Sequence, residues 1–306
     1  MAEIHIVLAT YNGAKFIKEQ LDSILNNSWK DLTIEVCDDG STDETLEIVS
    51  KYVKTYDNVT LHRNEKNLGY VMNFMEGIKR SQSPYIMLCD QDDIWHVDKI
   101  QKTYNRMREL EKEMSSQVPL LVYSDAMNFD SDTGEELGSF HKSSHLDTEK
   151  VDLAHLLMEN KCIGCTVMVN GVIRDYLKEL SPAIRVHDWW LALICSCFGK
   201  IAYLDESTLQ YRQHSGNMIG GSGFSTYVGN RLKNMQKQKL AIRATFEQGK
   251  AFYQTFSGQL ENDAKDVLAT FARMDAAGFL RRRLWLVQYG FWKSGIVRNV
   301  ALFFMI

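Results

Sequence analysis

The chain of 306 residues is poor in proline and has no long uninterrupted apolar run. Its three prolines argue against long disordered linkers. Charged residues interrupt every apolar stretch before it reaches the roughly 20 residues that a membrane-spanning helix requires. The formal net charge is −4, so no excess of positive charge indicates a nucleic acid partner. With 45% apolar and 24% charged residues, the chain has the composition of a globular protein with a substantial core.

A secretion signal and disulfide bonds are not expected either. Glu3 and His5 interrupt any apolar segment near residue 1, so no signal peptide is predicted. The six cysteines of a chain of cytosolic character are expected to be free thiols. Four of them could bind zinc as thiolates: Cys162, Cys165, Cys195 and Cys197. Their Cys-x-Cys spacing is poor for such a site, and the apolar residues around them favour packing in a core.

The first hundred residues alternate between β-rich runs and segments whose apolar residues have helical spacing. Strands are predicted at residues 4–9, 32–37, 59–62 and 85–89, with amphipathic helices between them. This alternation requires right-handed crossovers and a mainly parallel sheet. Ligands of such sheets bind beyond the carboxyl ends of the strands. We therefore predict an α/β domain with a mixed, mainly parallel sheet flanked by helices.

The pattern changes after residue 120. Further elements are predicted as strands at 121–125, 166–169, 201–204 and 209–211, a turn at 132–134 and a helix at 187–198. No strand-like run follows the glycines at 220, 221 and 223. We predict one domain over residues 1–222, in two halves at 1–100 and 101–222. A helical, basic extension is predicted over 223–306.

Two acidic turns follow strands of the predicted sheet. Asp90 and Asp92, on either side of Gln91, come directly after the fourth strand, where both carboxylates can converge on Mg²⁺ or Mn²⁺. A cation there would bridge the protein and a diphosphate ligand. A solvated acidic turn is the alternative, but the position beyond a strand end favours a binding site.

The second acidic turn contains Asp39, at the end of the second strand. Its carboxylate could accept the imide N–H of a pyrimidine base or ribose hydroxyl groups. Capping of the next helix is the alternative role, although Ser41 and Asp43 can serve as caps without it. Thr10 and Tyr11, with the adjacent Asn12, offer backbone groups and an aromatic face for the same base.

Together these motifs resemble family 2 glycosyltransferases of the GT-A fold. They are ATYNG at residues 9–13, DDGSTD at 38–43, NLG at 67–69 and DQDD at 90–93. The likeness continues through HDWW at 187–190 and YRQH at 211–214, which are similar to segments of bacterial rhamnosyltransferases that build cell-wall polysaccharides. It covers roughly residues 1–220 and implies that the domain at 1–222 is catalytic, with a nucleotide-binding half at 1–100 and an acceptor half at 101–222. The resemblance implies an inverting, metal-dependent transfer of a sugar, with dTDP-L-rhamnose as the favoured donor, to a hydroxyl of a lipid-linked or oligosaccharide acceptor.

The resemblance also implies a role for each matching residue. Asp188 is the implied catalytic base. Implied metal contacts are Asp92, Asp90 and His214, with Mg²⁺ or Mn²⁺ as cofactor. Implied contacts to the nucleotide or donor sugar are Thr10, Tyr11, Asn12, Asp39, Asn67, Gly69, Asp90, Gln91, Asp93, Trp95 and Arg212. Implied acceptor contacts are Gly164, His187 and Trp189. Cys165 stands where related sequences tend to carry glycine.

The position of Asp188 gives the implied base a physical rationale. Inversion in a single displacement needs a base opposite the leaving diphosphate, to take the proton of the acceptor hydroxyl. His187 and Asp188 open a predicted helix, whose positive end stabilises a carboxylate. The alternative is a helix cap, with Trp189 and Trp190 in the core. His214 has a bland alternative too, as an ordinary loop histidine.

The last third of the chain combines basic and aromatic residues. Trp285, Phe291 and Trp292 lie among arginines and lysines, a composition that suits a helix in a membrane interface. Packing of a basic helix on the catalytic domain is the alternative. The first reading predicts a peripheral enzyme at the cytoplasmic face of a bacterial plasma membrane.

Other functions fit the sequence less well. A UDP-hexose could replace dTDP-rhamnose as donor. A sugar nucleotidyltransferase would need a glycine-rich basic loop after the first strand, and residues 10–14 lack one. A non-catalytic nucleotide-sugar binding module would have no need of Asp188. A dehydrogenase is disfavoured because no G-x-G-x-x-G follows the first strand.

Overall fold

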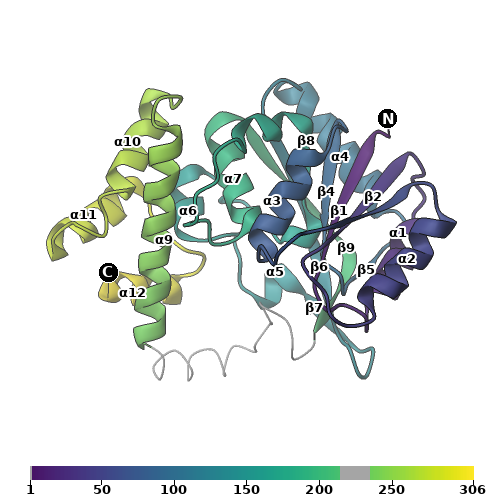
Figure 1. Ribbon diagram of the computed structural model, residues 1–306. Coiled ribbons are helices and arrows are strands. Elements are labelled where there is room, and N and C mark those ends of the chain that lie inside the picture. Colours follow the sequence, from purple (N-terminus) through teal and green to yellow (C-terminus); the bar gives the residue numbers. More distant parts are fainter. Residues whose placement is uncertain (1, 214–234) are drawn as a thin grey trace.

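The computed structural model describes residues 2–213 and 235–306. Within them a nine-stranded sheet lies between layers of helices, and further helices gather at the opposite end of the molecule from the N-terminus (Figure 1). The strands are β1 (Ile4–Thr10), β2 (Leu32–Asp38), β3 (Val59–Arg63), β4 (Tyr85–Cys89), β5 (Ile94–Trp95), β6 (Leu120–Asp130), β7 (Glu136–Ser139), β8 (Met168–Asn170) and β9 (Lys200–Gln213).

The helices follow the alternation that the sequence predicts. Those of the sheet domain are α1 (Ile17–Leu25), α2 (Thr45–Thr55), α3 (Tyr70–Arg80), α4 (Lys99–Glu113), α5 (Phe140–Ser143), α6 (Leu153–Met158) and α7 (His187–Phe198), with short 3₁₀ turns η1 (Gly164–Thr166) and η2 (Gly171–Tyr176). The C-terminal helices are α9 (Met235–Phe256), α10 (Asn262–Phe271), α11 (Phe279–Tyr289) and α12 (Ile296–Met305).

The strand order is β3-β2-β1-β4-β8-β6-β9-β5, with β7 paired to β6. Strands β1 to β4 are parallel, while β8 runs antiparallel between β4 and β6. The mixed sheet of the prediction is therefore confirmed. Its parallel part sends the loops after β1, β2 and β4 to one edge, because parallel strands end on the same side.

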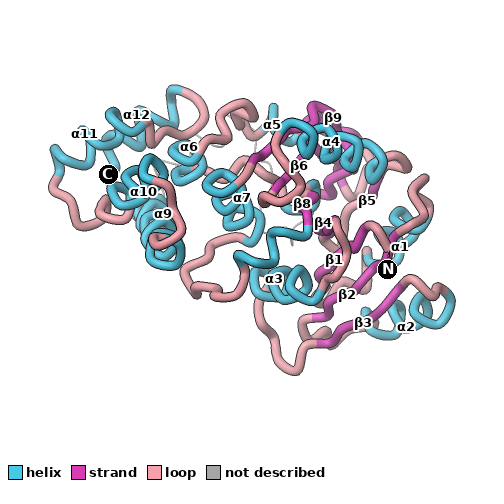
Figure 2. The backbone as a smooth tube through the Cα atoms, turned by 90° about the horizontal axis from the view of Figure 1, so that it is seen from above, coloured by secondary structure: helices cyan, strands magenta, loops and turns pink. Residues whose placement is uncertain are grey.

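Apolar residues fill both faces of the sheet, as alternation along a strand requires. From β1, Ile4, Ile6 and Leu8 enter a core with α1, α2 and α4. Val7 points to the other face and joins a core with α3 and α7. The view from above separates these two helix layers (Figure 2). Both faces are covered, so the rigid sheet fixes the positions of the loops at its edge.

One prediction of strand boundaries was wrong. The two short strands expected at 201–204 and 209–211 form one strand, β9, paired in parallel with β6. The register shifts around Asp125, so Asp205 and Glu206 of β9 form an exposed irregularity rather than a break. A bulge keeps a strand continuous while polar residues leave the ladder, and the apolar pattern alone does not reveal this.

The C-terminal helices pack on the sheet domain through α9. The ring of Phe252 meets Trp190 of α7 at 5.0 Å between centroids, and residues from α9 to α12 join the core on that face. Gly249 permits a close approach, because a Cβ there would lie 2.4 Å from the ring of Phe271. The predicted boundary at residue 222 lies outside the described residues. Among the described helices, none combines the length and apolar character needed to cross a bilayer.

Candidate active site

The loops after β1 and β2 are fastened to each other by hydrogen bonds. The Asn12 N–H donates to Ser41 Oγ (2.9 Å), and Asn12 Oδ1 accepts from the Thr42 N–H (2.8 Å). The Gly13 N–H donates to Thr45 Oγ1 (2.8 Å). Asn12 has φ of 49°, a left-handed conformation that asparagine tolerates better than most residues. Two motifs that are separated by about 30 positions in the chain thus form one rigid rim.

Gln91 joins the acidic turn after β4 to this rim. Its Oε1 accepts from Thr10 Oγ1 (2.7 Å) and from the Tyr11 N–H (2.9 Å). Gly13 makes room for it, because a Cβ at that position would lie 2.3 Å from Gln91 Oε1. The Tyr11 side chain is 49% exposed and so presents an aromatic surface beside the rim. Three motifs now share one edge of the sheet.

The buried carboxylate of Asp39 organises the start of α3. It accepts hydrogen bonds from Asn64 Nδ2 and from the N–H groups of Leu68 and Gly69, each at 2.8 Å. Asn67 donates to the backbone oxygen of Asp39 (2.9 Å). An ionised carboxylate has about four acceptor positions, so these three bonds leave about one for an N–H donor from outside. The NLG motif therefore orients the Asp39 carboxylate and leaves it able to contact a nucleotide base, as predicted.

Acidic groups crowd the end of β4. Ligand atoms of Asp90, Asp93 and Cys165 lie within 4.8 Å of one another. Desolvation, and then the negative charges of Asp93 and Asp92, hold the pKa of Asp90 well above its ordinary value. Desolvation, followed by the charge of Asp92, raises the pKa of Asp93 to about 7. Carboxylates crowded in this way favour a cation or a proton between them.

These residues fit a divalent cation. Asp90 belongs to this group, and Asp92 follows it by two residues. Both residues are half-buried, and they supply the hard oxygen ligands that Mg²⁺ and Mn²⁺ prefer. The resemblance implied a donor contact for Asp93 and no role for Cys165, and the structure places both beside Asp90. Within the described residues, the four cysteines considered for zinc do not form a ligand group.

A buried lysine below the acidic group was missed by the sequence analysis. Lys99, at the start of α4, is fully buried, donates to Thr208 Oγ1 (3.1 Å) and lies 4.7 Å from the ring centre of Trp95. Burial lowers its pKa to about 8, and the nearby Asp93 carboxylate opposes this shift. Trp95, predicted to line a sugar pocket, is itself buried against this lysine. A lysine at a position where the helical spacing of α4 calls for an apolar residue was the signal that could have revealed it.

Arg212, near the end of β9, is hydrogen-bonded to the acidic turn that follows β4. Its Nε donates to the backbone oxygen of Asp92 (2.7 Å), and its N–H donates to Asp93 Oδ1 (3.3 Å). Three further side chains enclose the guanidinium: Phe16, Glu19 and Phe129. The sequence prediction placed Arg212 at the donor, and the structure shows it fixing the turn that carries the predicted metal ligands.

Asp188 occupies the first turn of α7, where it is buried but hydrogen-bonded. Its Oδ1 accepts from Asn160 Nδ2 (2.9 Å) and from the Trp189 N–H (2.6 Å). Burial raises the pKa of Asp188 to about 7, against the lowering effect of hydrogen bonds from Trp189, Gly164 and Asn160. A carboxyl with this pKa can exchange a proton near neutral pH. Asn160 belongs to no recognisable motif, so its role could not be predicted from the sequence.

His187 lies beside Asp188 against Gly164. A Cβ on Gly164 would lie 2.7 Å from His187 Nε2 and 3.2 Å from Asp188 Oδ2, so a larger residue would displace both. The imidazole stacks on Phe74 at 4.0 Å, and neither ring nitrogen has a hydrogen-bond partner among the described residues. Burial lowers the pKa of His187 to about 3, which keeps the ring neutral. Trp189 packs inward and donates through Nε1 to the Leu156 oxygen.

Tyr70, the first residue of α3, lies near both halves of the site. The charges of Asp188 and Asp90 both contribute to raising the pKa of Tyr70, after desolvation, so the phenol lies near both carboxylates. The charge of Asp188 also raises the pKa of Asp90. The predicted base and the predicted metal ligands therefore share one site. His214 lies outside the described residues.

Comparison with known proteins identifies the family. The model of "Glycosyl transferase family 2" matches residues 5–166, which is more than half of the chain. The chain belongs to glycosyl transferase family 2. The matched segment carries the loops after β1, β2 and β4, and the resemblance that the motifs predicted is confirmed.

Relatives of this family 2 glycosyltransferase extend the match. The dTDP-rhamnosyl transferase RfbG of Shigella flexneri is 29% identical over 230 residues, covering 70% of this chain and 74% of that protein. The structure of S. aureus TarS 1–349 in complex with UDP-GlcNAc matches with a TM-score of 0.60 at 15% identity, covering 93% and 79%. The mannosyltransferase PcManGT from Pyrobaculum calidifontis, in complex with GDP-Man and Mn²⁺, gives 0.54 at 13% identity, covering 99% and 87%. These structures confirm the GT-A fold.

Proposed function

We propose that this glycosyltransferase inverts the anomeric centre of a nucleotide diphosphate sugar, with L-rhamnose as the sugar. One observation carries the proposal: a buried carboxylate, Asp188, shares the site with the acidic group after β4. A base and a diphosphate-binding group on opposite sides of one site are the two elements that a single displacement requires.

In the proposed reaction, Asp188 takes the proton of the acceptor hydroxyl. The acceptor oxygen forms a bond to the anomeric carbon as the bond from that carbon to the diphosphate oxygen breaks. The nucleotide diphosphate leaves with the electron pair of the broken bond. Asn160 and the Trp189 N–H both donate to Oδ1 of Asp188. In this proposal Oδ2, the atom facing Gly164, receives the proton.

Asp92 and Asp90 are the residues that would hold Mg²⁺ or Mn²⁺ in this proposal. The cation, when bound, neutralises the charge that develops on the leaving diphosphate. Arg212 keeps the Asp92 turn in place from β9, and Gln91 fastens it to the rim of Thr10 and Tyr11. Loss of either contact would loosen both carboxylates together.

The nucleotide is proposed to bind along the rim after β1 and β2. The acceptor position left on Asp39 suits the imide N–H of thymine or uracil, and the exposed ring of Tyr11 suits stacking on a base. Asn67 and Gly69 contribute by orienting Asp39. These contacts support a pyrimidine nucleotide, and they fit the base of dTDP and that of UDP equally.

With dTDP-L-rhamnose as donor we expect metal-dependent release of dTDP, which grows on addition of acceptor. The similarity to a dTDP-rhamnosyl transferase over 70% of this chain motivates the choice of sugar. UDP-GlcNAc, the sugar nucleotide in the TarS complex, is the matched comparison. A coupled assay for nucleoside diphosphate compares the two donors. Turnover of UDP-GlcNAc with no turnover of dTDP-L-rhamnose would reject rhamnose and keep the reaction class.

Asn160→Ala is expected to shift the acidic limb of the pH–rate profile upward by about one pH unit. Asp188 must be ionised to accept a proton, so the rate rises as pH passes its pKa of about 7. Removing the Asn160 donor destabilises the ionised form and raises that pKa. Transfer should therefore fall about tenfold at pH 6 and change little at pH 9.

The exposed Asn105→Ala on α4 is the matched control for this substitution. Initial rates between pH 5.5 and 9.5, at saturating donor, measure the profile. A loss of the same size at every pH would show that Asn160 supports the fold and does not affect the charge of Asp188.

The cellular setting completes the proposal. We propose a catalytic unit over residues 1–222, followed by a helical extension over 223–306, that works on a lipid-linked or oligosaccharide acceptor. Peripheral contact with the cytoplasmic face of a bacterial plasma membrane would bring the enzyme to such an acceptor. The basic and aromatic composition of the extension supports this placement.

A further inference from the structure

The outer sides of α11 and α12 expose large apolar side chains. We call this surface the tail face, and its members are Phe279, Leu280, Leu284, Val287, Ile296, Val297, Val300 and Phe304. Leu280 is 78%, Ile296 83% and Phe304 76% exposed, whereas the inner sides of the same helices are buried in the core. Concentrated exposure of this kind marks an interaction surface.

The charge of this segment indicates the kind of partner. Residues 279–306 contain five arginines and lysines and no aspartate or glutamate, although the whole chain has a net charge of −4. Arg283 is buried, and Arg298 pairs with Glu159 at 2.8 Å. Arg281, Arg282 and Lys293 stay at least partly exposed. Apolar residues interleaved with cations complement an anionic lipid surface, in which the aromatic residues enter the head-group region.

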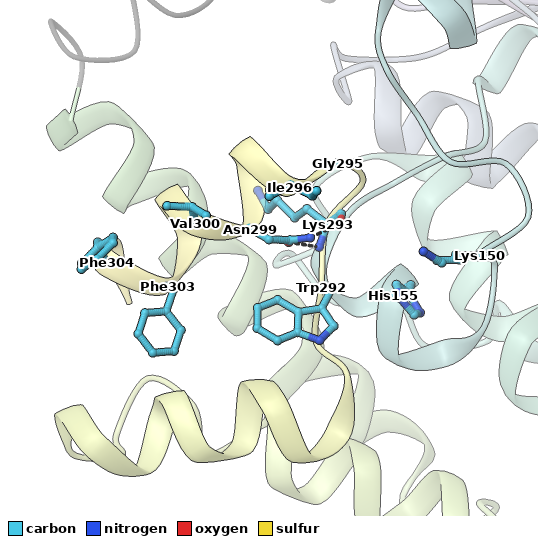
Figure 3. Close-up of a pocket in the computed structure, with 10 residues that line it drawn as sticks. All are labelled: Lys150, His155, Trp292, Lys293, Gly295, Ile296, Asn299, Val300, Phe303 and Phe304. Atoms are coloured by element: carbon cyan, nitrogen blue, oxygen red, sulfur yellow. Dashed lines mark hydrogen bonds between the residues drawn. The ribbon is translucent and has the colours of Figure 1, made fainter.

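A pocket of about 500 Å³ opens beside α12 (Figure 3). Trp292, Phe303 and Val300 are among the apolar residues that line it, and Lys150, His155 and Lys293 are its basic lining residues. Lys150 pairs with Asp147 (3.1 Å), and His155 pairs with Asp152 (2.7 Å). Figure 3 shows Lys150 and His155 coming from the sheet domain, opposite α12. An apolar wall facing Lys150 and Lys293 suits a molecule with a hydrocarbon chain and a phosphate, because the ammonium group of Lys150 stays exposed despite its pair with Asp147.

We propose that the tail face rests on an anionic bilayer and that this pocket binds the phosphate head group of one lipid from it. The lipid's chain runs along Trp292 and Phe303 toward the bilayer, and its phosphate meets Lys150 and Lys293. The occupant is a phosphate-bearing lipid, because the pocket joins the tail face through Ile296, Val300 and Phe304, which belong to both.

The pocket is close to the predicted base through a short connection. His155 lies on α6, and Asn160, five residues later, donates to Asp188. Five residues span at most about 18 Å, so the pocket edge lies within that reach of the residue that touches the base. A lipid phosphate held there would bring an attached sugar toward Asp188. This last step rests on the proposed transfer reaction, and bilayer contact deepens the membrane placement proposed above. The vesicle tests below need neither a donor nor transfer.

Sedimentation of the full-length protein with vesicles, without donor, tests the tail face. The vesicles contain phosphatidylcholine alone or mixed with phosphatidylglycerol. We expect binding to the mixed vesicles, and a loss of about tenfold or more for Ile296→Ser combined with Phe304→Ser, because two exposed anchors lose their apolar surface. The matched control is Val97→Ser combined with Leu137→Ser, which changes two exposed apolar residues of the sheet domain and should leave binding unchanged.

A pair of charge reversals tests the pocket. Lys150→Glu should weaken binding to the mixed vesicles about tenfold or more, since a reversal removes one attraction and adds one repulsion. Lys142→Glu reverses another exposed lysine outside the pocket and should change binding less than about twofold. Equal losses for the two reversals would overturn the pocket assignment.

Two results would overturn the bilayer assignment. One is equal binding of the wild-type protein and the Ile296→Ser, Phe304→Ser variant to mixed vesicles. The other is a dimer in light scattering that this variant dissociates, because the tail face would then join two copies of the chain. Both tests measure vesicle binding without sugar transfer. Their results can therefore be interpreted even if the enzyme uses another sugar.

Discussion

Asp188→Asn is expected to reduce transfer to acceptor by about two to four orders of magnitude while donor affinity stays nearly unchanged. Asp188 acts when the acceptor proton leaves, so its charge stabilises the transition state more than the bound donor. The amide keeps the shape of the carboxyl, and its oxygen can still accept from Asn160 and from the Trp189 N–H. The substitution therefore separates chemistry from folding.

Calorimetry with donor and metal, beside a transfer assay, measures the two effects of this substitution. Asp175→Asn, an exposed carboxyl on η2, is the matched control and should keep full activity. If donor binding fell in step with turnover, Asp188 would hold the donor, the metal or the fold, and another residue would have to be the base.

Asp92→Asn is expected to abolish measurable turnover and to weaken metal-dependent donor binding by roughly 100-fold or more. Loss of groups that merely orient metal ligands costs up to about 100-fold in affinity, and a direct ligand should cost at least as much. The amide removes a charge that faces the diphosphate through the cation. The fold should persist, because the backbone oxygen of Asp92 keeps its hydrogen bond from Arg212.

Donor binding titrated with and without Mn²⁺ tests this prediction, with the exposed Asp57→Asn as control. Asp93→Asn provides a second comparison, because Asp93 belongs to the buried group with Asp90 and Cys165. Metal-dependent binding that survives in Asp92→Asn and fails in Asp93→Asn would move the ligand role from Asp92 to Asp93. Full activity of Asp92→Asn in chelator-treated buffer would reject the metal assignment.

The sequence predicted the features that depend on neighbours in the chain. Apolar periodicity located the parallel strands, and the polar motifs after β1, β2 and β4 could then be placed at one edge of the sheet. The motifs also predicted the family, and the family model confirmed it over residues 5–166. Short apolar runs are local properties, because they follow from the spacing of residues along the backbone.

What the sequence alone determined, then, was the α/β architecture, the glycosyltransferase family and the motifs at the carboxyl edge. Only the tertiary structure decided that Arg212 holds the Asp92 turn across 120 positions, that Asn160 orients Asp188, and that Lys99 lies buried below the acidic group. It also joined strands 201–204 and 209–211 into β9. These contacts join segments far apart in the chain, and their geometry follows from strand order and antiparallel insertions such as β8. Burial then sets the pKa values of Asp188 and Lys99, since desolvation is a property of the packed molecule and not of the chain.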